Sequence, residues 1–341
     1  MKAVTLQDLA NTLGVARSTV SRALRDDPQI SPTTRGHVHR LARQLGYRPN
    51  AAARALTHRH SGVVGVVLPR SAPFVFANPY FATLLEGIAS VAEEAGLPML
   101  LSSSPTPDHE RWLREARVDG LVALGHSLAE PDLDGLEALG AGPAAIALVG
   151  APRRTTSLPV VAAAEAPGIE AACRHLADAG HTDVALVRGP PGAAYARARA
   201  DAWQAAAEAA GLRVRITVDG DDTQPGGAAA AQRLLTLPNP PEAWAFGNDA
   251  MAFGALGVLR SARVHVPEQV AVVGFDDVPA AALVGLSTVH QPIRALGAHA
   301  MRIVVAALRG EAAPAQDFTT HLEPRITTRS PASDHATEDT R

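Results

Sequence analysis

Residues 4–56 constrain the fold most, because they hold short helix patterns separated by turn signals. Apolar side chains recur with helical spacing over residues 6–13, and Gly14 follows where a helix end needs a positive φ. A second helix pattern restarts at once over residues 17–24. Two short helices joined by a tight glycine turn predict a helix-turn-helix, whose second helix presents its first residues to the major groove of DNA.

Capping signals support this interpretation. Thr5 begins the first helix and Asp8 follows three residues later, which is the spacing of a capping box. Ser31 and Pro32 predict the start of a third helix, because Ser caps helices well and Pro suits the first helical position. The segment therefore predicts a small all-α head.

The second helix has one apolar and one polar face. Val20, Ala23 and Leu24 can pack inward. A polar set is then left facing outward: Arg17, Ser18, Ser21 and Arg22. Arginine can form two hydrogen bonds with a guanine edge, and serine can bind a base or a phosphate. This face is the candidate base-reading surface.

Residues 50–58 follow the head and predict a conditional helix. Asn50 is a good N-cap for one or two helical turns, but so short a helix is unstable alone in water. Leu56 is its only large apolar side chain and suits insertion into a minor-groove step. A plain linker, with Leu56 packed on the rest of the chain, is the alternative that the residues alone leave open.

The charge is distributed unevenly. The net charge is −3, yet residues 1–60 carry ten Lys or Arg against three Asp. A basic head on an acidic remainder is typical of a protein that contacts phosphates at one end only. Cys173 is the single cysteine, no Cys/His spacing suits zinc, and no apolar run reaches the roughly 20 residues of a membrane span. We expect a cytoplasmic protein without metal or cofactor, since the first residues also lack a signal-peptide core.

From residue 62 the pattern changes to alternating strands and helices. Residues 62–69 form a continuous apolar run of the kind found in buried parallel strands. The alternation predicts two doubly wound parallel sheets, one from residues 62–160 with 292–328 and one from 161–291. Ligands bind such folds at the carboxyl ends of the strands. The polar tail, residues 329–341, is expected to be disordered.

Several motifs together resemble the lactose-repressor (LacI/GalR) family of transcription regulators. In the head they are VTLQDLANTLGV, STVSRAL, SPTTR, LGYRPN and AAARAL; in the body they include NPYFATLLEGI, GNDAMAFGAL, VPEQVAVVGFDDVP and STVHQPIRALG. The resemblance covers nearly the whole chain. It implies a DNA-binding domain over residues 1–48, a hinge helix and linker over 49–61, and a periplasmic-binding-protein-like body. It also implies a homodimer that binds a pseudo-palindromic operator in double-stranded DNA.

The resemblance assigns roles in the head. Bases would be read by Arg17, Ser18 and Arg22, and phosphates would be held by Thr5, Thr19 and Ser21. The hinge helix would contribute Asn50, Ala53 and Leu56, with Leu56 as the minor-groove wedge. Ala16 departs from the family, which commonly has a hydroxyl N-cap there, and a missing cap costs about 1 kcal/mol of helix stability.

In the body the resemblance implies a small-molecule effector site. By position, its contacts would be Arg199, Asn248, Asp276 and Gln291, with Phe76, Asn78, Phe81 and His126 as further candidates. These groups suit a polyol, because charged and amide groups bond hydroxyls while an aromatic face stacks on a sugar ring. Gln291 has a plainer reading, in which it only satisfies backbone groups beside a proline.

Other candidates also have plainer readings. Asn248 can simply cap the helix that follows it. Asp276 and Asp277 can be read as a metal or acid–base pair, but adjacent residues on a turn point apart. We therefore expect Asp276 to accept from a ligand and Asp277 to be a surface or capping residue. Of Arg199 and nearby Arg197, one is expected to be solvated.

Three departures from the family bear on the effector. The segment between Ser104 and Arg117 is short, Gly150 stands where an acidic sugar contact is common, and Glu165 with two preceding alanines replaces a common Val-Asp opening. Two acidic groups are therefore expected to be missing. A sugar is the first expectation, and a less hydroxylated or anionic ligand is the alternative.

We therefore predict a sequence-specific transcription regulator, a repressor whose operator affinity depends on a small molecule. The alternative is a cytoplasmic small-molecule binding protein without DNA control. An enzyme is not expected, because the chain has no Walker loop, nucleophile elbow or HExxH motif.

Overall fold

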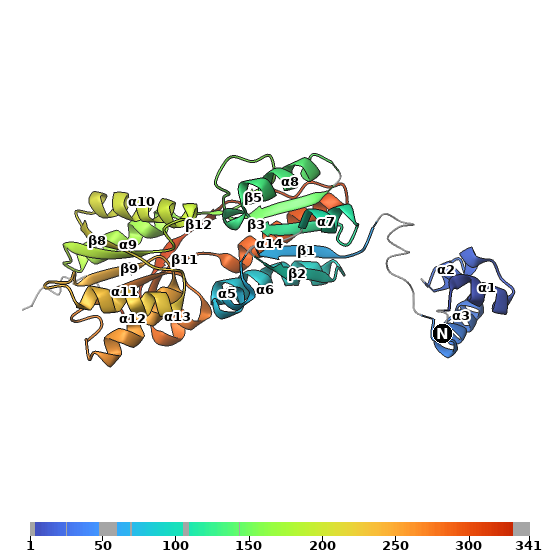
Figure 1. Cartoon of the computed structure of the whole chain (residues 1–341), viewed down its shortest axis with the longest axis horizontal. Helices are drawn as coiled ribbons and strands as arrows, with labels where there is room; N and C mark the ends of the chain where they lie inside the picture. Colours follow the sequence, from blue (N-terminus) through green and yellow to red (C-terminus); the bar gives the residue numbers. More distant parts are fainter. Residues whose placement is uncertain are drawn as a thin grey trace, which may run out of the picture. The chain divides into compact units, whose positions relative to one another are not determined.

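The computed structural model describes residues 4–24, 26–47, 60–68, 70–104, 109–142 and 144–329. The chain divides into two compact units after Ser61, and we call them the head and the body (Figure 1). The expected hinge helix, residues 50–58, lies outside the described residues. The expected disordered tail, residues 329–341, lies outside them as well, except for Arg329.

The head is a three-helix unit whose ends carry the expected caps. Its helices are α1 (Leu6–Leu13), α2 (Arg17–Ala23) and α3 (Pro32–Gln44). The Thr5 hydroxyl accepts from the Asp8 amide while the Asp8 carboxylate accepts from the Thr5 amide, so the capping box is confirmed. Gly14 adopts φ 65°, and Ser31 caps α3 by accepting from the Thr34 amide. Local sequence therefore sets the helix boundaries.

A small apolar core holds these helices together. Leu9, Val20, Ala23 and Val38 are fully buried between them. Ala16 stands at the N-cap of α2 and provides no side-chain hydrogen bond, as the sequence predicts. The second helix is therefore fixed by packing rather than by its own cap.

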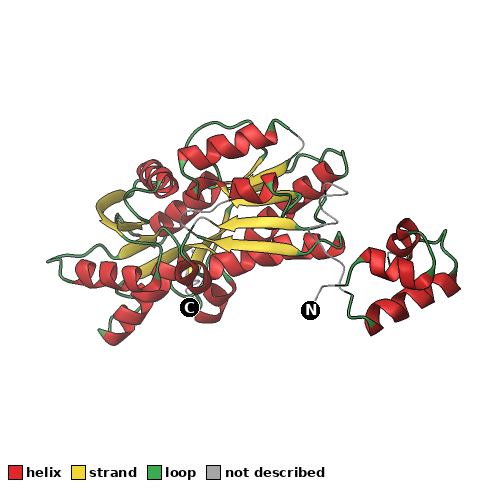
Figure 2. Cartoon of the chain, turned by 45° about the vertical axis from the view of Figure 1, so that its right-hand side comes forward, coloured by secondary structure: helices red, strands yellow, loops and turns green. Residues whose placement is uncertain are grey.

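The body has two lobes, each a sheet between helices (Figure 2). The first lobe holds a parallel sheet of order β2-β1-β3-β4-β5. Its strands are β1 (Val64–Leu68), β2 (Met99–Ser103), β3 (Gly120–Leu124), β4 (Ala145–Val149) and β5 (Val160–Val161). Its helices are α5 (Ala72–Ala77), α6 (Pro79–Glu94), α7 (His109–Arg114), the 3-10 turn Gly125–Ser127 and α8 (Glu130–Gly140).

The second lobe holds a mixed sheet of order β13-β11-β10-β9-β7-β8, parallel except for β13. Its strands are β7 (Asp183–Arg188), β8 (Arg213–Asp219), β9 (Ala243–Phe246), β10 (Ala271–Asp276), β11 (Ser287–His290) and β13 (His321–Glu323). Its helices are α9 (Ala166–Asp178), α10 (Ala194–Ala209), α11 (Gln224–Leu235), α12 (Asp249–Ser261) and α13 (Pro279–Val284). Cys173 and Trp203 lie in its core.

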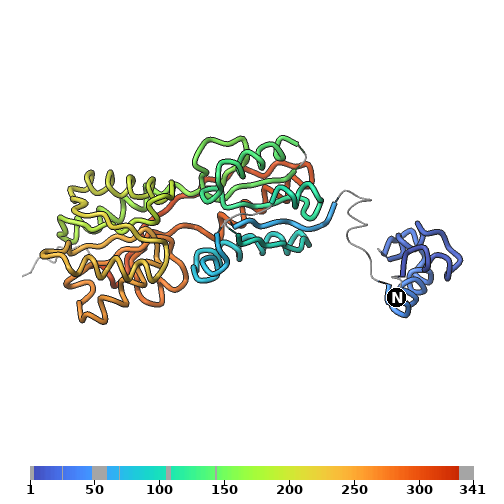
Figure 3. Tube along the Cα trace, in the orientation of Figure 1, coloured from blue at the N-terminus to red at the C-terminus, as the bar shows by residue number. Residues whose placement is uncertain are grey.

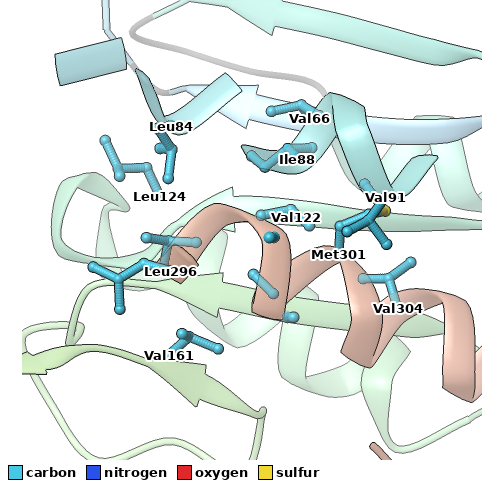
Figure 4. Packing of buried hydrophobic residues seen from close by; sticks show 14 of the residues in the cluster. Val66, Leu84, Ile88, Val91, Val122, Leu124, Val161, Leu296, Met301 and Val304 are labelled. Carbon is cyan, nitrogen blue, oxygen red and sulfur yellow. The ribbon is translucent and has the colours of Figure 1, made fainter. Parts of the chain in front are cut away.

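The final long helix, α14 (Ile293–Leu308), returns to the first lobe. Leu296, Met301 and Val304 pack there with Ile88 of α6 and Val122 of β3 (Figure 4). Within the described body the chain passes between the lobes after β5, after β11 and after α14 (Figure 3). The lobes thus share three connections, which fixes where their facing edges meet.

The structure corrects the expected ends of the two sheets. Strands near residues 317–328 were expected to rejoin the first set, but β12 (Phe318–Thr319) pairs with β6 (Ala163–Ala164) and β13 pairs with β11 of the second lobe. The expectation was wrong because strand–helix alternation predicts only parallel neighbours, whereas β13 runs antiparallel.

Among the described helices, none combines the length and the hydrophobicity that a membrane span requires.

Candidate functional site

In the head, α2 places its polar residues on one surface. Val20 and Ala23 face the core and are fully buried. Arg17 and Ser18 are exposed, and Thr19, Ser21 and Arg22 are partly exposed. The structure therefore brings the expected base-reading residues to the outer side of one helix, where their donors can reach a groove.

Two of the expected DNA contacts already have partners within the head. The Thr5 hydroxyl donates to the Asp8 carboxylate at 2.8 Å, so it serves the capping box. The Arg22 Nε donates to Asp27 at 2.8 Å, and Arg22 also donates to the Gln29 side chain. Three further expected contacts, Asn50, Ala53 and Leu56, lie outside the described residues. The DNA-binding roles of the whole set stay predictions.

In the body, the facing edges of the lobes enclose a cavity of about 490 Å³. It lies at the carboxyl ends of the strands, where a doubly wound fold binds ligands. His126 follows β3, Asn248 follows β9, Asp276 ends β10 and Gln291 follows β11. Side chains from both lobes therefore point into one space, although they are far apart in the sequence.

Seven of the eight expected effector residues line this cavity: Asn78, Phe81, His126, Arg199, Asn248, Asp276 and Gln291. The exception is Phe76, whose expected place was wrong, because it is 73% exposed and outside the cavity lining. Phe76 lies on the short helix α5, and a helix turns adjacent residues to different faces. Val75 takes the buried face instead.

Arg199 of α10 is the most heavily bonded residue of the cavity. Its guanidinium binds both carboxylate oxygens of Glu165 at 2.8 and 2.5 Å, donates to the Gly247 carbonyl at 2.7 Å, and lies 3.7 Å from the centre of the Phe275 ring. Burial disfavours its charge, yet Glu165 and the other carboxyls together raise the pKa of Arg199 above its ordinary value. Arg197 is exposed, as one of the pair was expected to be.

The expected shortage of acidic groups was only partly correct. Glu165 lines the cavity through its ion pair with Arg199, and Asp222 from the loop after β8 lines it as well. No carboxylate stands at Gly150, where φ is 78° and an added Cβ would lie 2.3 Å from His126. The imidazole of His126 thus fills the space beside Gly150, and acidic groups come from other elements.

Asn248 and Asp276 both face the cavity, but Asn248 is hydrogen-bonded to neighbouring groups whereas Asp276 has a perturbed pKa. Asn248 caps α12 by accepting from the Met251 amide at 2.9 Å, and it also donates to the Asp222 carbonyl. The capping role is therefore confirmed, and the side chain also lines the cavity, where its contact with a ligand stays a prediction. Burial raises the pKa of Asp276 well above its usual range, with Arg199 acting in the opposite direction. A buried carboxyl of this kind is suited to hydrogen bonds from a ligand.

Asp277 is not the surface or capping residue that was expected. It bonds His290 at 2.9 Å and Arg325 at 2.7 Å, and these partners lower the pKa of its carboxyl against the effect of burial. The two neighbouring carboxyls have different surroundings, because Asp276 lines the cavity whereas Asp277 is bound to His290 and Arg325 outside its lining.

Sequence reasoning missed a bridge across the cavity. Arg70, two residues after β1, donates to the Tyr195 hydroxyl of α10 at 3.0 Å and to Ser127 at 3.2 Å. The Tyr195 hydroxyl donates in turn to Asp222. Arg70 belongs to the first lobe, whereas Tyr195 and Asp222 belong to the second. No local motif marks these residues, so only the fold brings them together.

His126 packs against this bridge. Its ring lies 4.7 Å from the Tyr195 ring, edge to face. Burial, assisted by the charges of Arg70 and Arg199, lowers the pKa of His126 to about 3. The imidazole is therefore neutral at physiological pH and offers one donor and one acceptor. Over the part of the chain that the structure describes, no cluster of three His, Cys, Asp or Glu side chains could hold a metal ion.

Comparison with known proteins gives the same two-part division. Residues 5–50 match the family model of bacterial regulatory proteins, lacI family, and residues 173–330 match the periplasmic binding protein-like domain. The ribose operon repressor of Escherichia coli (strain K12) is 31% identical over 325 residues, covering 88% of this chain and 92% of the relative. The HTH-type transcriptional regulator CelR of Thermobifida fusca is 32% identical over 320 residues, covering 90% and 92%.

Solved structures agree with these relatives. The crystal structure of the lac repressor dimer bound to operator and the anti-inducer ONPF has a TM-score of 0.81 and 25% identity, covering 96% of this chain and 99% of that one. A complex of the regulator CelR with cellobiose has a TM-score of 0.68 and 28% identity, covering 95% and 99%. The helical head, the two-lobed body and these matches show that the chain belongs to the lacI family of bacterial regulatory proteins.

Proposed function

We propose that the protein represses transcription by binding operator DNA with its head, and that a small polar molecule bound in the cavity of the body sets the affinity of the head for that DNA. The observation that carries this proposal is the convergence of Arg199, Asn248, Asp276 and Gln291 on one cavity. The head supplies a separate surface of DNA-binding chemistry on α2. A role on DNA places the protein in the cytoplasm, and the role is regulatory rather than catalytic.

The cavity chemistry favours a hydroxyl-rich ligand such as a sugar. Asp276 accepts hydrogen bonds, Arg199 donates them, and the amide groups of Asn248 and Gln291 can do both. On the first lobe, Phe74 and Phe81 pack edge to face with ring centres 5.7 Å apart and form an apolar wall. A ring with a polar rim and an apolar face fits such a surface. The relatives named above include a ribose operon repressor and a regulator bound to cellobiose.

Control requires that the ligand bind two arrangements of the lobes with different affinity. Two contacts already join the lobes at the cavity, between Arg70 and Tyr195 and between Asn78 and the Asp222 carbonyl. A ligand that changes these contacts changes the relative position of the lobes. The arrangement of the lobes that the ligand binds more tightly decides whether the ligand weakens or strengthens the binding of operator DNA.

We propose that the protein acts as a homodimer, so that two heads meet a pseudo-palindromic operator. Each lobe carries an exposed apolar surface that suits a second copy. In the first lobe it is the edge strand β2, where Met99, Leu100 and Leu101 are each 36% exposed. In the second lobe Leu283 and Ile326 are 88% and 72% exposed. The solved lac repressor named above is a dimer bound to operator.

The test joins a ligand screen to a DNA-binding assay. Sugars, nucleosides and small acids are screened for a rise in the melting temperature of the full chain, because a ligand stabilises the state that binds it. A hit should change operator affinity of the wild type and should not change that of Asp276→Ala, which still binds DNA without ligand. Phe76→Ala is the matched control and should respond like the wild type. A hit that still controls Asp276→Ala would exclude this cavity as the effector site.

The alternative, a small-molecule binding protein without DNA control, makes a different prediction. It requires no DNA affinity beyond a weak effect of the basic head. A regulator instead binds its own promoter region with an affinity that falls steeply as salt rises, because each phosphate contact releases counterions. DNA affinity that is weak and independent of salt would favour the alternative.

A further inference from the structure

The turn between α2 and α3 holds the side chain of Arg22 in one orientation. The Arg22 Nε donates to the Asp27 Oδ2 at 2.8 Å, and the Arg22 Nη2 donates to the Gln29 Oε1. The other oxygen of Asp27 accepts from the Gln29 backbone amide at 2.9 Å. The carboxylate is therefore fixed by the turn on one side and fixes the arginine on the other.

These contacts occupy the side of the guanidinium formed by Nε and Nη2 and leave its end, formed by Nη1 and Nη2, available. Nε and Nη2 share the edge that faces Asp27 and Gln29. The hydrogen bonds and ion pair of Arg22 with residues 4–24 and 26–47 do not use the end of the group, which is formed by Nη1 and the second hydrogen of Nη2. Two parallel N–H groups at this end match the O6 and N7 acceptors of guanine in the major groove.

We infer that Asp27 is a positioning residue, which holds Arg22 so that the end of its guanidinium reads guanine. The inference rests on the proposed DNA-reading role of α2. An arginine that is already oriented loses less conformational freedom when it binds, and it tolerates other bases less well because it cannot turn to meet them. Asp27 thus contributes to the choice of sequence without touching a base.

The charge of Asp27 separates this role from a purely structural one. The carboxylate adds a negative charge next to DNA phosphates, so its removal should strengthen binding to unrelated DNA. Loss of its hold on Arg22 should at the same time weaken the preference for guanine. A residue that only stabilised the turn would change binding to all sequences alike.

Asp26 provides a matched control in the same turn. It carries the same charge one residue earlier, but its carboxylate contacts His39 at 3.1 Å rather than Arg22. It adopts φ 56°, a conformation that asparagine tolerates, so Asp26→Asn keeps the turn. Asp26→Asn and Asp27→Asn therefore remove the same charge, and only the second weakens the hold on Arg22.

The experiment selects bound DNA from a library with a randomised half-site, using the full chain. The proteins compared are the wild type, Arg22→Ala, Asp27→Asn, Asp27→Ala and Asp26→Asn. Loss of Arg22 should abolish the preference for guanine at one position, and Asp27→Ala should lower it at that same position by about tenfold. Asp27→Asn should have a smaller effect at that position, and Asp26→Asn should leave the preference unchanged while raising affinity for all sequences.

Three results would overturn the inference. The preference could survive Asp27→Ala, it could fall equally with Asp26→Asn, or it could be lost at positions that Arg22→Ala does not affect. Circular dichroism in the helical region shows whether the head of each variant is folded. If Asp27→Ala does not fold, Asp27→Asn takes its place in the comparison, because it keeps the acceptor for the Gln29 amide. If the wild type selects no sequence at all, the proposed function itself has failed, and that outcome is distinct from these three.

Discussion

In the head, the outward polar side chains come from the single seven-residue helix α2, whereas the cavity of the body draws on residues as distant as Arg70 and Gln291. The head is held by caps and turns that span three to five residues, such as Thr5 with Asp8. The body cavity is held by contacts such as Arg70 with Tyr195, which are 125 residues apart in the sequence. The head is therefore a local construction, and the cavity is a product of the whole fold.

This difference predicts that head and body can be damaged separately. The head has few buried side chains, so one large truncation should unfold it. The cavity residues bind each other through ion pairs and hydrogen bonds, so their loss should change ligand response and stability of the body alone.

The largest effect is expected for Leu9→Ala, in the core of the head. Leu9 is fully buried, and the truncation of a buried leucine costs about 3 kcal/mol in the free energy of unfolding. Calorimetry of the full chain should show the head transition lowered or lost and the body transition unchanged. Leu45→Ala is the control, because Leu45 is 42% exposed and should change little. A body transition that falls with Leu9→Ala would contradict the separation.

Arg199→Ala is expected to destabilise the body by about 2 kcal/mol, because it leaves Glu165 without its partner in a mostly buried place. The exposed Arg197→Ala is the matched control on the same helix and should stay within roughly 0.5 kcal/mol of the wild type. Denaturant unfolding of both variants measures the difference. Equal stability of the two variants would mean that the ion pair contributes nothing.

His126 predicts a dependence of body stability on pH. Its folded-state pKa is lowered to about 3, whereas the unfolded chain takes up a proton near the ordinary value of 6.5. The neutral His126 therefore contributes its full share to the free energy of unfolding above about pH 6.5. This share is lost as the pH falls toward 3, by about 1.4 kcal/mol per pH unit at most. His126→Gln cannot take up this proton, so the wild type should lose more stability than the variant between pH 6 and 4. Parallel pH profiles for the two proteins would show that His126 titrates normally.

The smallest effect is expected for Ala16→Ser. The N-cap of α2 has no side-chain hydrogen bond, and a serine there can accept from an amide of the first turn. The head transition should rise by the equivalent of roughly 0.5–1 kcal/mol, while the body transition should not move. Thr5→Ala provides the opposite change at the capped helix α1 and should lower the same transition by a similar amount.

The same difference explains what the sequence could predict. Thr5, Gly14 and Ser31 were assigned correctly because a cap depends on residues a few positions away. Asn248 and Asp276 were expected at the ligand site because the family resemblance implies it, and both line the cavity. The family motifs gave the two-domain order as well.

The residues that were missed lie where no local pattern exists. Arg70, Tyr195 and Asp222 meet only because both lobes fold and face each other. The sequence around Glu165 was interpreted as lacking an acidic ligand contact, because it replaces the Val-Asp opening that is common in the family. Its position at the start of α9 nevertheless brings the Glu165 carboxylate to Arg199. Phe76 was misplaced because periodicity over a six-residue helix is too short to show which face is buried.

The most direct test of the account is selection of genomic DNA fragments by the full chain, comparing the wild type with Arg22→Ala and Asp276→Ala. We predict that the wild type and Asp276→Ala enrich the same pseudo-palindromic site and that Arg22→Ala loses the preference. A ligand from the screen should change enrichment by the wild type and not by Asp276→Ala. Enrichment of the same site by Arg22→Ala, or ligand control that persists in Asp276→Ala, would contradict the division between a reading head and a sensing body.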